Sequence, residues 1–241
     1  MSGHSKWNNI KHKKEKADAA KAKIFTKIGK EMAVAIKAGG PDPNNNSKLR
    51  DLIAKAKANN VPNDNIQRTI KKFSDNSDIN FEEIVYEGYG PSGVAIIVET
   101  STDNRNRTAG NVRAAFSKYG GNLGQNGCVG YLFEEKGVIT IVDEEDEIDE
   151  DKIMEDALEA GAEDIKCDEG EYSIYTEPSD LDAVRDAIIA LGYKIDTADL
   201  AKVPTTYTEL TSEEDIANME KMLDKFNEDD DVNAVFTNWD H

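Results

Sequence analysis

The sequence is short of the residues that most catalytic and metal sites need. Its 241 residues include two cysteines and three histidines. His4, His12 and His241 all lie near the ends of the chain, where no rigid pocket for a general base is expected. Cys128 and Cys167 are far apart, and neither belongs to a CxxC pair. We therefore predict no catalytic residue, metal site, cofactor or small-molecule substrate, and the protein is not expected to be an enzyme.

Long apolar runs are also missing. No stretch approaches the roughly 18 apolar residues that a membrane-spanning helix needs. The first residues form neither an apolar secretory signal nor an Arg-rich mitochondrial presequence. Two unpaired cysteines fit a reducing compartment. These features predict a cytoplasmic protein without a membrane partner.

Charge is divided unevenly along the chain, whose formal net charge is -19. Residues 1–72 hold 17 Lys and Arg against 6 Asp and Glu, a net of +11, whereas the remaining residues hold 12 against 42, a net of -30. Such asymmetry indicates a nucleic-acid-facing end on an acidic protein. Screening beyond a Debye length of roughly 8 Å keeps the acidic part from cancelling the pull on phosphates.

The first 16 residues have no apolar periodicity, so we predict an arm that is flexible when unbound. Lysines release counterions from a phosphate backbone, and an aromatic ring stacks on a base. The alternative is a tail whose Trp7 packs on the neighbouring helices. The arm residues expected to bind nucleic acid are Lys6, Trp7, Lys11, His12, Lys13, Lys14 and Lys16.

From Ala17 onward, apolar residues recur at helical spacing and predict three short amphipathic helices with mostly basic outer faces. The first ends at Gly39-Gly40, and Ser47 is expected to cap the second. The second and third, joined by a short turn, resemble a helix-turn-helix, although any helical hairpin gives this pattern. The candidate nucleic-acid contacts on these helices are Lys21, Lys23, Lys27, Lys30, Arg68, Lys71 and Lys72.

The apolar period then changes to two. FEEIVYEGYG and GVAIIVETST predict a hairpin around Pro91-Ser92-Gly93, followed by a helix between Arg105 and Tyr119 and a strand at CVGYLFEE. From Gly137 the predicted order is βαββαβ, which is ferredoxin-like. A last helix and strand follow. Because these two cannot bury their apolar faces alone, we expect them to return to the middle domain.

The predicted fold class is therefore α+β, with an N-terminal three-helix domain and two α+β domains, of which the inserted one is ferredoxin-like. The expected bounds are residues 1–78 for the basic helical domain, 79–135 with 205–241 for a discontinuous middle domain, and 136–204 for the acidic domain.

The segment TDNRNRT allows two interpretations. Thr102, Asp103 or Asn104 is expected to cap the following helix. In the first interpretation, the free N–H groups at the start of that helix bind a phosphate, with help from Arg105, Arg107 and Arg113. Alternatively, one arginine forms an ion pair with the abundant acids of the same chain. Elsewhere, GGNLGQNG lacks a P-loop ending, and DEEDEIDED lacks the spacing of a calcium loop.

Five blocks in this order resemble the YebC/PmpR family over essentially the whole chain. They are GHSKWNNIKHKK (3–14), NVPNDNIQRTIKK (60–72), YEGYGPSGVAIIVE (86–99), TDNRNRT (102–108) and GGNLGQNGCVGYLF (120–133). The resemblance implies a three-domain α+β protein with a discontinuous middle domain. It also implies a function in either transcription or translation.

Bacterial members of that family are described as DNA-binding transcriptional regulators. Others, including mitochondrial translational activators of cytochrome oxidase, are similar to ribosome-associated factors. The resemblance thus implies a partner that is DNA and the transcription machinery, or ribosomal RNA and the ribosome. A further alternative is a protein-interaction module in which the acidic domains carry the function and the basic end serves solubility.

Overall fold

The computed structural model describes residues 17–74, 80–143, 147–168 and 170–240 of an α+β protein. The chain divides into two compact units. The first unit holds residues 17–128 and Ser212–Val235, and the second, here called the acidic unit, holds Val129–Thr211 and the last residues of the chain. Residues 129–211 contain 6 Lys and Arg against 25 Asp and Glu.

The first unit begins with three helices that share one apolar core. They are α2 (Ala17–Gly39), α3 (Ser47–Ala58) and α4 (Asn63–Ser74). Their inward faces follow the helical spacing of the apolar residues. The exception is Ile24, whose side chain is exposed. The buried side chains of this core include Ile28, Met32, Ile36, Leu49, Leu52 and Ile66.

The start of α3 is fixed by Asn46, so the prediction of Ser47 as the cap was wrong. The side-chain oxygen of Asn46 accepts a hydrogen bond from the Leu49 N–H at 3.1 Å. Its amide donates to the carbonyl oxygens of Ala35 and Gly40, each at 2.8 Å. One buried amide therefore satisfies the end of α2 and the beginning of α3 together, which a serine hydroxyl has too few groups to do.

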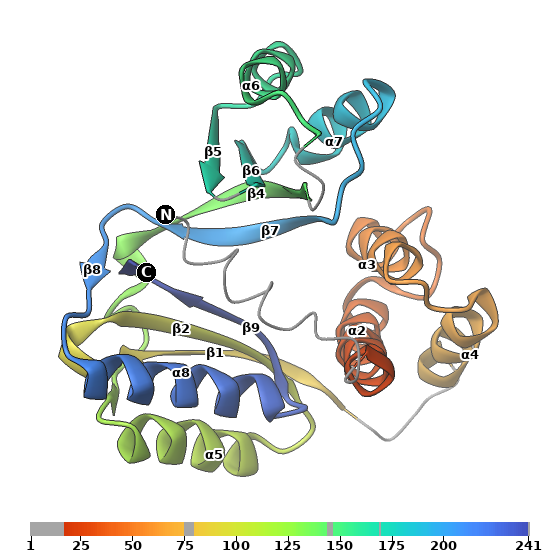
Figure 1. Ribbon diagram of the computed structural model, residues 1–241. Helices are drawn as coiled ribbons and strands as arrows, with labels where there is room; N and C mark the ends of the chain where they lie inside the picture. The colour runs from red at the N-terminus through yellow and green to blue at the C-terminus, as the bar shows by residue number, and fades with distance from the viewer. Residues whose placement is uncertain (1–16, 75–79, 144–146, 169, 241) are drawn as a thin grey trace. The chain divides into compact units, whose positions relative to one another are not determined.

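The sheet of the first unit has the order β3-β1-β2-β9. Strands β1 (Glu82–Tyr89) and β2 (Ala95–Thr102) form the expected hairpin, while β3 (Asn122–Leu123) and β9 (Val232–Thr237) lie at its two edges. Helices α5 (Arg105–Lys118) and α8 (Glu213–Glu228) lie along one face of this sheet (Figure 1). The rings of Phe116 and Phe226, with centroids 5.2 Å apart, join the two helices.

The acidic unit has the ferredoxin-like order of elements. In sequence these are β4 (Phe133–Val142), α6 (Glu150–Glu159), β5 (Asp164–Asp168), β6 (Glu171–Thr176), α7 (Leu181–Ala190) and β7 (Thr197–Pro204). The strands form an antiparallel sheet in the order β5-β6-β4-β7, with both helices on one face (Figure 1). Ile139, Ile141, Ile174 and Ile188 are fully buried between sheet and helices.

The separate strand expected at CVGYLFEE does not form. Gly130–Leu132 is a short 3-10 turn, and β4 continues without interruption from Phe133 to Val142. The edge of the first unit's sheet is occupied by β3 instead. Two further short strands, β8 (Thr208–Glu209) and β10 (Trp239–Asp240), pair in parallel. Within the described ranges, no helix has the length and apolar character that crossing a membrane requires.

Candidate nucleic-acid interface

The arm residues proposed from the sequence lie outside the described residues. These are Lys6, Trp7, Lys11, His12, Lys13, Lys14 and Lys16. Lys21 lies on α2. The other candidates lie on α2, α4 and α5.

The hairpin of α3 and α4 turns one face of α4 outward. Asn60 has a φ of 58°, in the left-handed region, and the Val61 N–H donates to the Ala56 carbonyl at 2.9 Å. This turn places Ile66 in the core, and Ile70 and Phe73 pack against it. The opposite face of α4 is left to solvent.

That outward face is cationic. Arg68, Lys71 and Lys72 are exposed and stand at i, i+3 and i+4, so they share one side of the helix. Among the described residues, no carboxylate forms an ion pair with any of the three. Asn65 and Gln67 are also exposed. Arginine and amide side chains are the groups that read base edges in a groove, while lysines contact phosphates.

The lysines of α2 are arranged differently. Lys23 Nζ donates to the Glu228 carbonyl at 3.3 Å. Lys30 Nζ donates to the Asp230 carbonyl at 2.9 Å and forms an ion pair with Asp231 at 2.6 Å. Lys27 is half-buried and also makes an interaction within the protein. The α2 lysines are therefore partly occupied by the chain itself.

The segment TDNRNRT supplies one ion-pair network, centred on Arg107. Asn104 caps α5 by accepting a hydrogen bond from the Arg107 N–H at 3.1 Å. The Arg107 guanidinium pairs with Asp103 at 2.8 Å and with Asp231 at 2.6 Å. Arg105 and Arg113 are exposed. An internal ion pair, one of the two interpretations of this segment, is thus present at Arg107.

Asp231 is the centre of this network. One carboxylate oxygen, Oδ2, accepts hydrogen bonds from Arg107 and from the Thr108 hydroxyl at 2.8 Å, and the other, Oδ1, faces Lys30. Burial alone would raise the pKa of Asp231, but the hydrogen bonds from Lys30, Arg107 and Thr108 outweigh it and lower the pKa to about 2. The hydrogen bond from Arg107 to Asp231 in turn raises the pKa of Arg107.

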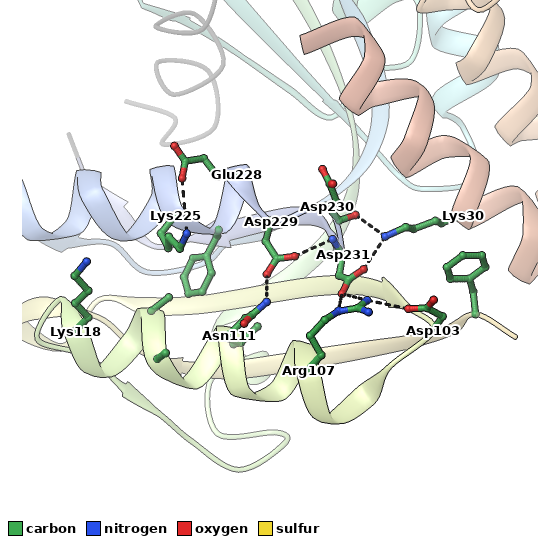
Figure 2. Close-up of a pocket in the computed structure, with 15 residues that line it drawn as sticks. Lys30, Asp103, Arg107, Asn111, Lys118, Lys225, Glu228, Asp229, Asp230 and Asp231 are labelled. Carbon is green, nitrogen blue, oxygen red and sulfur yellow. Dashed lines mark hydrogen bonds and ion pairs between the residues drawn. The ribbon is translucent and has the colours of Figure 1, made fainter. Parts of the chain in front are cut away.

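A groove of about 580 Å³ runs beside this network (Figure 2). Val112, Ala115 and Phe226 provide apolar lining, and charged groups of both signs surround them. Figure 2 shows Lys30 and Arg107 both pointing toward Asp231. Within the described residues, no cluster of three or more His, Cys, Asp or Glu side chains is placed to hold a metal ion.

Sequence reasoning missed the acidic turn between α8 and β9. It consists of Glu228, Asp229, Asp230 and Asp231, and will be called the acidic turn. The available signal was a run of four acids directly before a predicted strand, in a chain where acidic runs are common. Nothing local in the sequence distinguishes buried Asp231 from exposed Asp230.

Two domain families match the chain. Residues 5–76 match the TACO1/YebC protein N-terminal domain, and residues 81–239 match the TACO1/YebC second and third domain. A protein of Agathobacter rectalis named "probable transcriptional regulatory protein" is 56% identical over 100% of both chains. A protein of Lachnoclostridium phytofermentans with the same name is 53% identical over 100% of both chains. The crystal structure of a conserved hypothetical protein from Aquifex aeolicus has a TM-score of 0.85 and 44% identity, covering 96% of this chain and 95% of that one.

Proposed function

Because the chain belongs to the TACO1/YebC family, we propose that it is a regulatory protein that binds nucleic acid through its basic end. DNA is the proposed partner, and transcription the proposed process. The name that the Agathobacter and Lachnoclostridium proteins carry supports this choice. The role is one of binding rather than catalysis, and the bacterial cytoplasm is the proposed compartment.

The outward face of α4 is the observation that carries this proposal. Its three cations have no carboxylate partner among the described residues, so their charge is available to phosphates. The helix follows a short turn after α3, as the recognition helix does in a helix-turn-helix. Asn65 and Gln67 on the same helix add groups suited to base edges. Arg105 and Arg113 on α5 are proposed as further phosphate contacts.

A translation factor that binds ribosomal RNA is the second candidate. The same cationic face would contact the phosphates of an RNA helix, because counterion release does not depend on the sugar. The third interpretation, an acidic protein-interaction module, rests on the excess of acids in residues 129–211. It predicts that charge removal on α4 leaves function unchanged.

The first test removes the charges of the α4 face. The variant R68A/K71A/K72A should bind short DNA or RNA duplexes at least tenfold more weakly than the unmodified chain, since each lost phosphate contact weakens binding. The matched control K152A/K194A/K221A removes three exposed lysines elsewhere and should bind normally. Equal affinity of the two variants, measured by fluorescence anisotropy, would reject α4 as the interface.

Sedimentation of a cell lysate through a gradient separates the first two candidates. Co-migration with ribosomes that survives DNase treatment supports the translation factor. Migration away from ribosomes, together with tighter binding to duplex DNA than to duplex RNA, supports the transcriptional regulator. If R68A/K71A/K72A replaces the unmodified protein in cells without loss of its regulatory function, the protein-interaction module is favoured over the transcriptional regulator and the translation factor.

A further inference from the structure

We propose that the acidic turn is an autoinhibitory latch. It occupies the side of α2 that carries Lys23 and Lys30, and nucleic acid must displace it to use those lysines. This inference rests on the proposed function, because it concerns how the same basic end is regulated. It adds an internal competitor that sets the affinity of that end.

Both lysines lie on α2 and contact the acidic turn. Lys23 and Lys30 are seven residues apart, so they lie on one face of α2, two helical turns from each other. Lys23 Nζ reaches the Glu228 carbonyl at 3.3 Å, while Lys30 Nζ reaches the Asp230 carbonyl at 2.9 Å and Asp231 Oδ1 at 2.6 Å. Figure 2 shows the Lys30 contacts with Asp230 and Asp231 as dashed lines.

The turn presents α2 with the chemistry of a phosphate backbone. Two oxygen atoms of the turn accept hydrogen bonds from the Lys30 ammonium, and four successive residues of the turn carry carboxylates. An ammonium group binds carboxylate and phosphate oxygens through the same charge-assisted hydrogen bonds. Glu228 and Asp230 contact the two lysines through their backbone carbonyls only, and the Glu228 carboxylate also pairs with Lys225 at 3.8 Å. Their exposed carboxylates add a longer-range attraction, because they lie within a Debye length of these contacts. Turn and nucleic acid therefore compete for the same cations.

The latch can open without leaving Asp231 unpaired. Asp231 Oδ2 is held by Arg107 Nη2 at 2.6 Å, by Arg107 Nε at 3.1 Å and by the Thr108 hydroxyl at 2.8 Å. None of these bonds involves α2. Departure of Lys30 removes the partner of Oδ1 but leaves the buried carboxylate with a cation. Arg107 is thus the permanent counter-ion, and Lys30 is the one that nucleic acid can recruit.

The test compares two charge changes at opposite ends of α8 in the full chain. The variant E228Q/D230N removes two negative charges from the acidic turn. The control E213Q/E214Q removes two negative charges from the first turn of α8. We expect E228Q/D230N to bind a short mixed-sequence DNA duplex about threefold to tenfold more tightly than the unmodified chain. The variant keeps both backbone contacts but removes two surface charges, each worth up to about 1 kcal/mol to nearby cations. The control should bind as the unmodified chain does.

The outcomes separate the latch from net charge and from the proposed function. Equal tightening in both variants would show a general charge effect and overturn the latch. If the unmodified chain binds the duplex and E228Q/D230N binds it no more tightly, the latch is overturned while the proposed function stands. If no chain binds DNA or RNA duplexes, the proposed function falls and the latch with it. Binding by E228Q/D230N where the unmodified chain binds nothing would establish the latch in its strongest form.

Discussion

The substitution Asp231→Asn removes the charge at the centre of the ion-pair network and should destabilise the first unit strongly. The Asp231 side chain is only 5% exposed, and that of its partner Lys30 is 14% exposed. Removing one member of a buried ion pair costs about 3–5 kcal/mol, because the remaining charges lose their counter-ion. The lowering of the Asp231 pKa from 3.8 to about 2 corresponds to about 2 kcal/mol of favourable interaction with the charged form. Together these values lead us to expect a loss of about 3 kcal/mol.

The neighbouring residue supplies the control. Asp230→Asn makes the same chemical change on an exposed side chain, and Asp230 offers only its backbone carbonyl to Lys30. Its cost should stay below about 0.5 kcal/mol, as for most surface substitutions. Urea unfolding followed by far-ultraviolet circular dichroism gives the free energy of unfolding for each variant. In thermal scans, Asp231→Asn should lower Tm by about 6–12 °C.

Two results would refute this reasoning. A loss of less than about 1 kcal/mol for Asp231→Asn would mean that the network stabilises the fold no more than surface ion pairs do. Equal losses for Asp230→Asn and Asp231→Asn would mean that net charge in the acidic turn, rather than the buried contacts to Arg107 and Thr108, determines stability.

Three further predictions concern pH, the cap of α3 and the packing of β1. Because the pKa of Asp231 is lower in the folded state than in the unfolded state, its contribution is fully present above about pH 4 and is lost as pH falls toward 2; Asp231→Asn should abolish that part of the acid dependence in unfolding curves. Asn46→Ala, which removes the cap and both carbonyl contacts, should cost about 2 kcal/mol in urea unfolding, whereas Ser47→Ala should cost far less. Gly88→Ala should cost about 1–3 kcal/mol because its Cβ would lie 2.6 Å from the Asn122 carbonyl oxygen and 2.9 Å from the Phe116 ring; Gly110→Ala, with open space around it, should not destabilise α5.

Most helices and the ferredoxin-like order were predictable because their signals are local. Apolar side chains at helical spacing, such as Met32 and Ile36, are buried in α2, and the alternating Ile139 and Ile141 face the core of the acidic unit. The spacing of apolar residues and the residues that form turns determine these elements within short stretches of chain. A single sequence is therefore enough to predict them. The fold class followed from their order.

What could not be predicted depends on contacts between distant residues. The pairing of Arg107 with Asp231 spans 124 positions, and no local pattern marks Asp231 as the buried member of an acidic run. The continuity of β4 depends on its register with both β6 and β7, and the expected strand at CVGYLFEE was wrong for that reason. At Asn46 and Ser47, two good capping residues are adjacent, and only the distant carbonyl of Ala35 decides between them.

For the candidate site, the sequence predicts which residues carry positive charge but not which of them pair with carboxylates of the same chain. The same lysine-rich pattern covers α2 and α4, yet Lys30 is matched by Asp231, while Arg68 and Lys71 face solvent. Whether a cation is matched depends on which carboxylate the fold brings near it. The exposed face of α4 is therefore a more specific candidate than the sequence alone could define.

The salt dependence of nucleic-acid binding tests the central claim most directly. The logarithm of the binding constant should fall with the logarithm of salt concentration, and the slope should be about two to three units shallower for R68A/K71A/K72A than for the unmodified chain, since each phosphate contact contributes about 0.9. Identical slopes for the two proteins would contradict the account, because the α4 cations would then contact no phosphate.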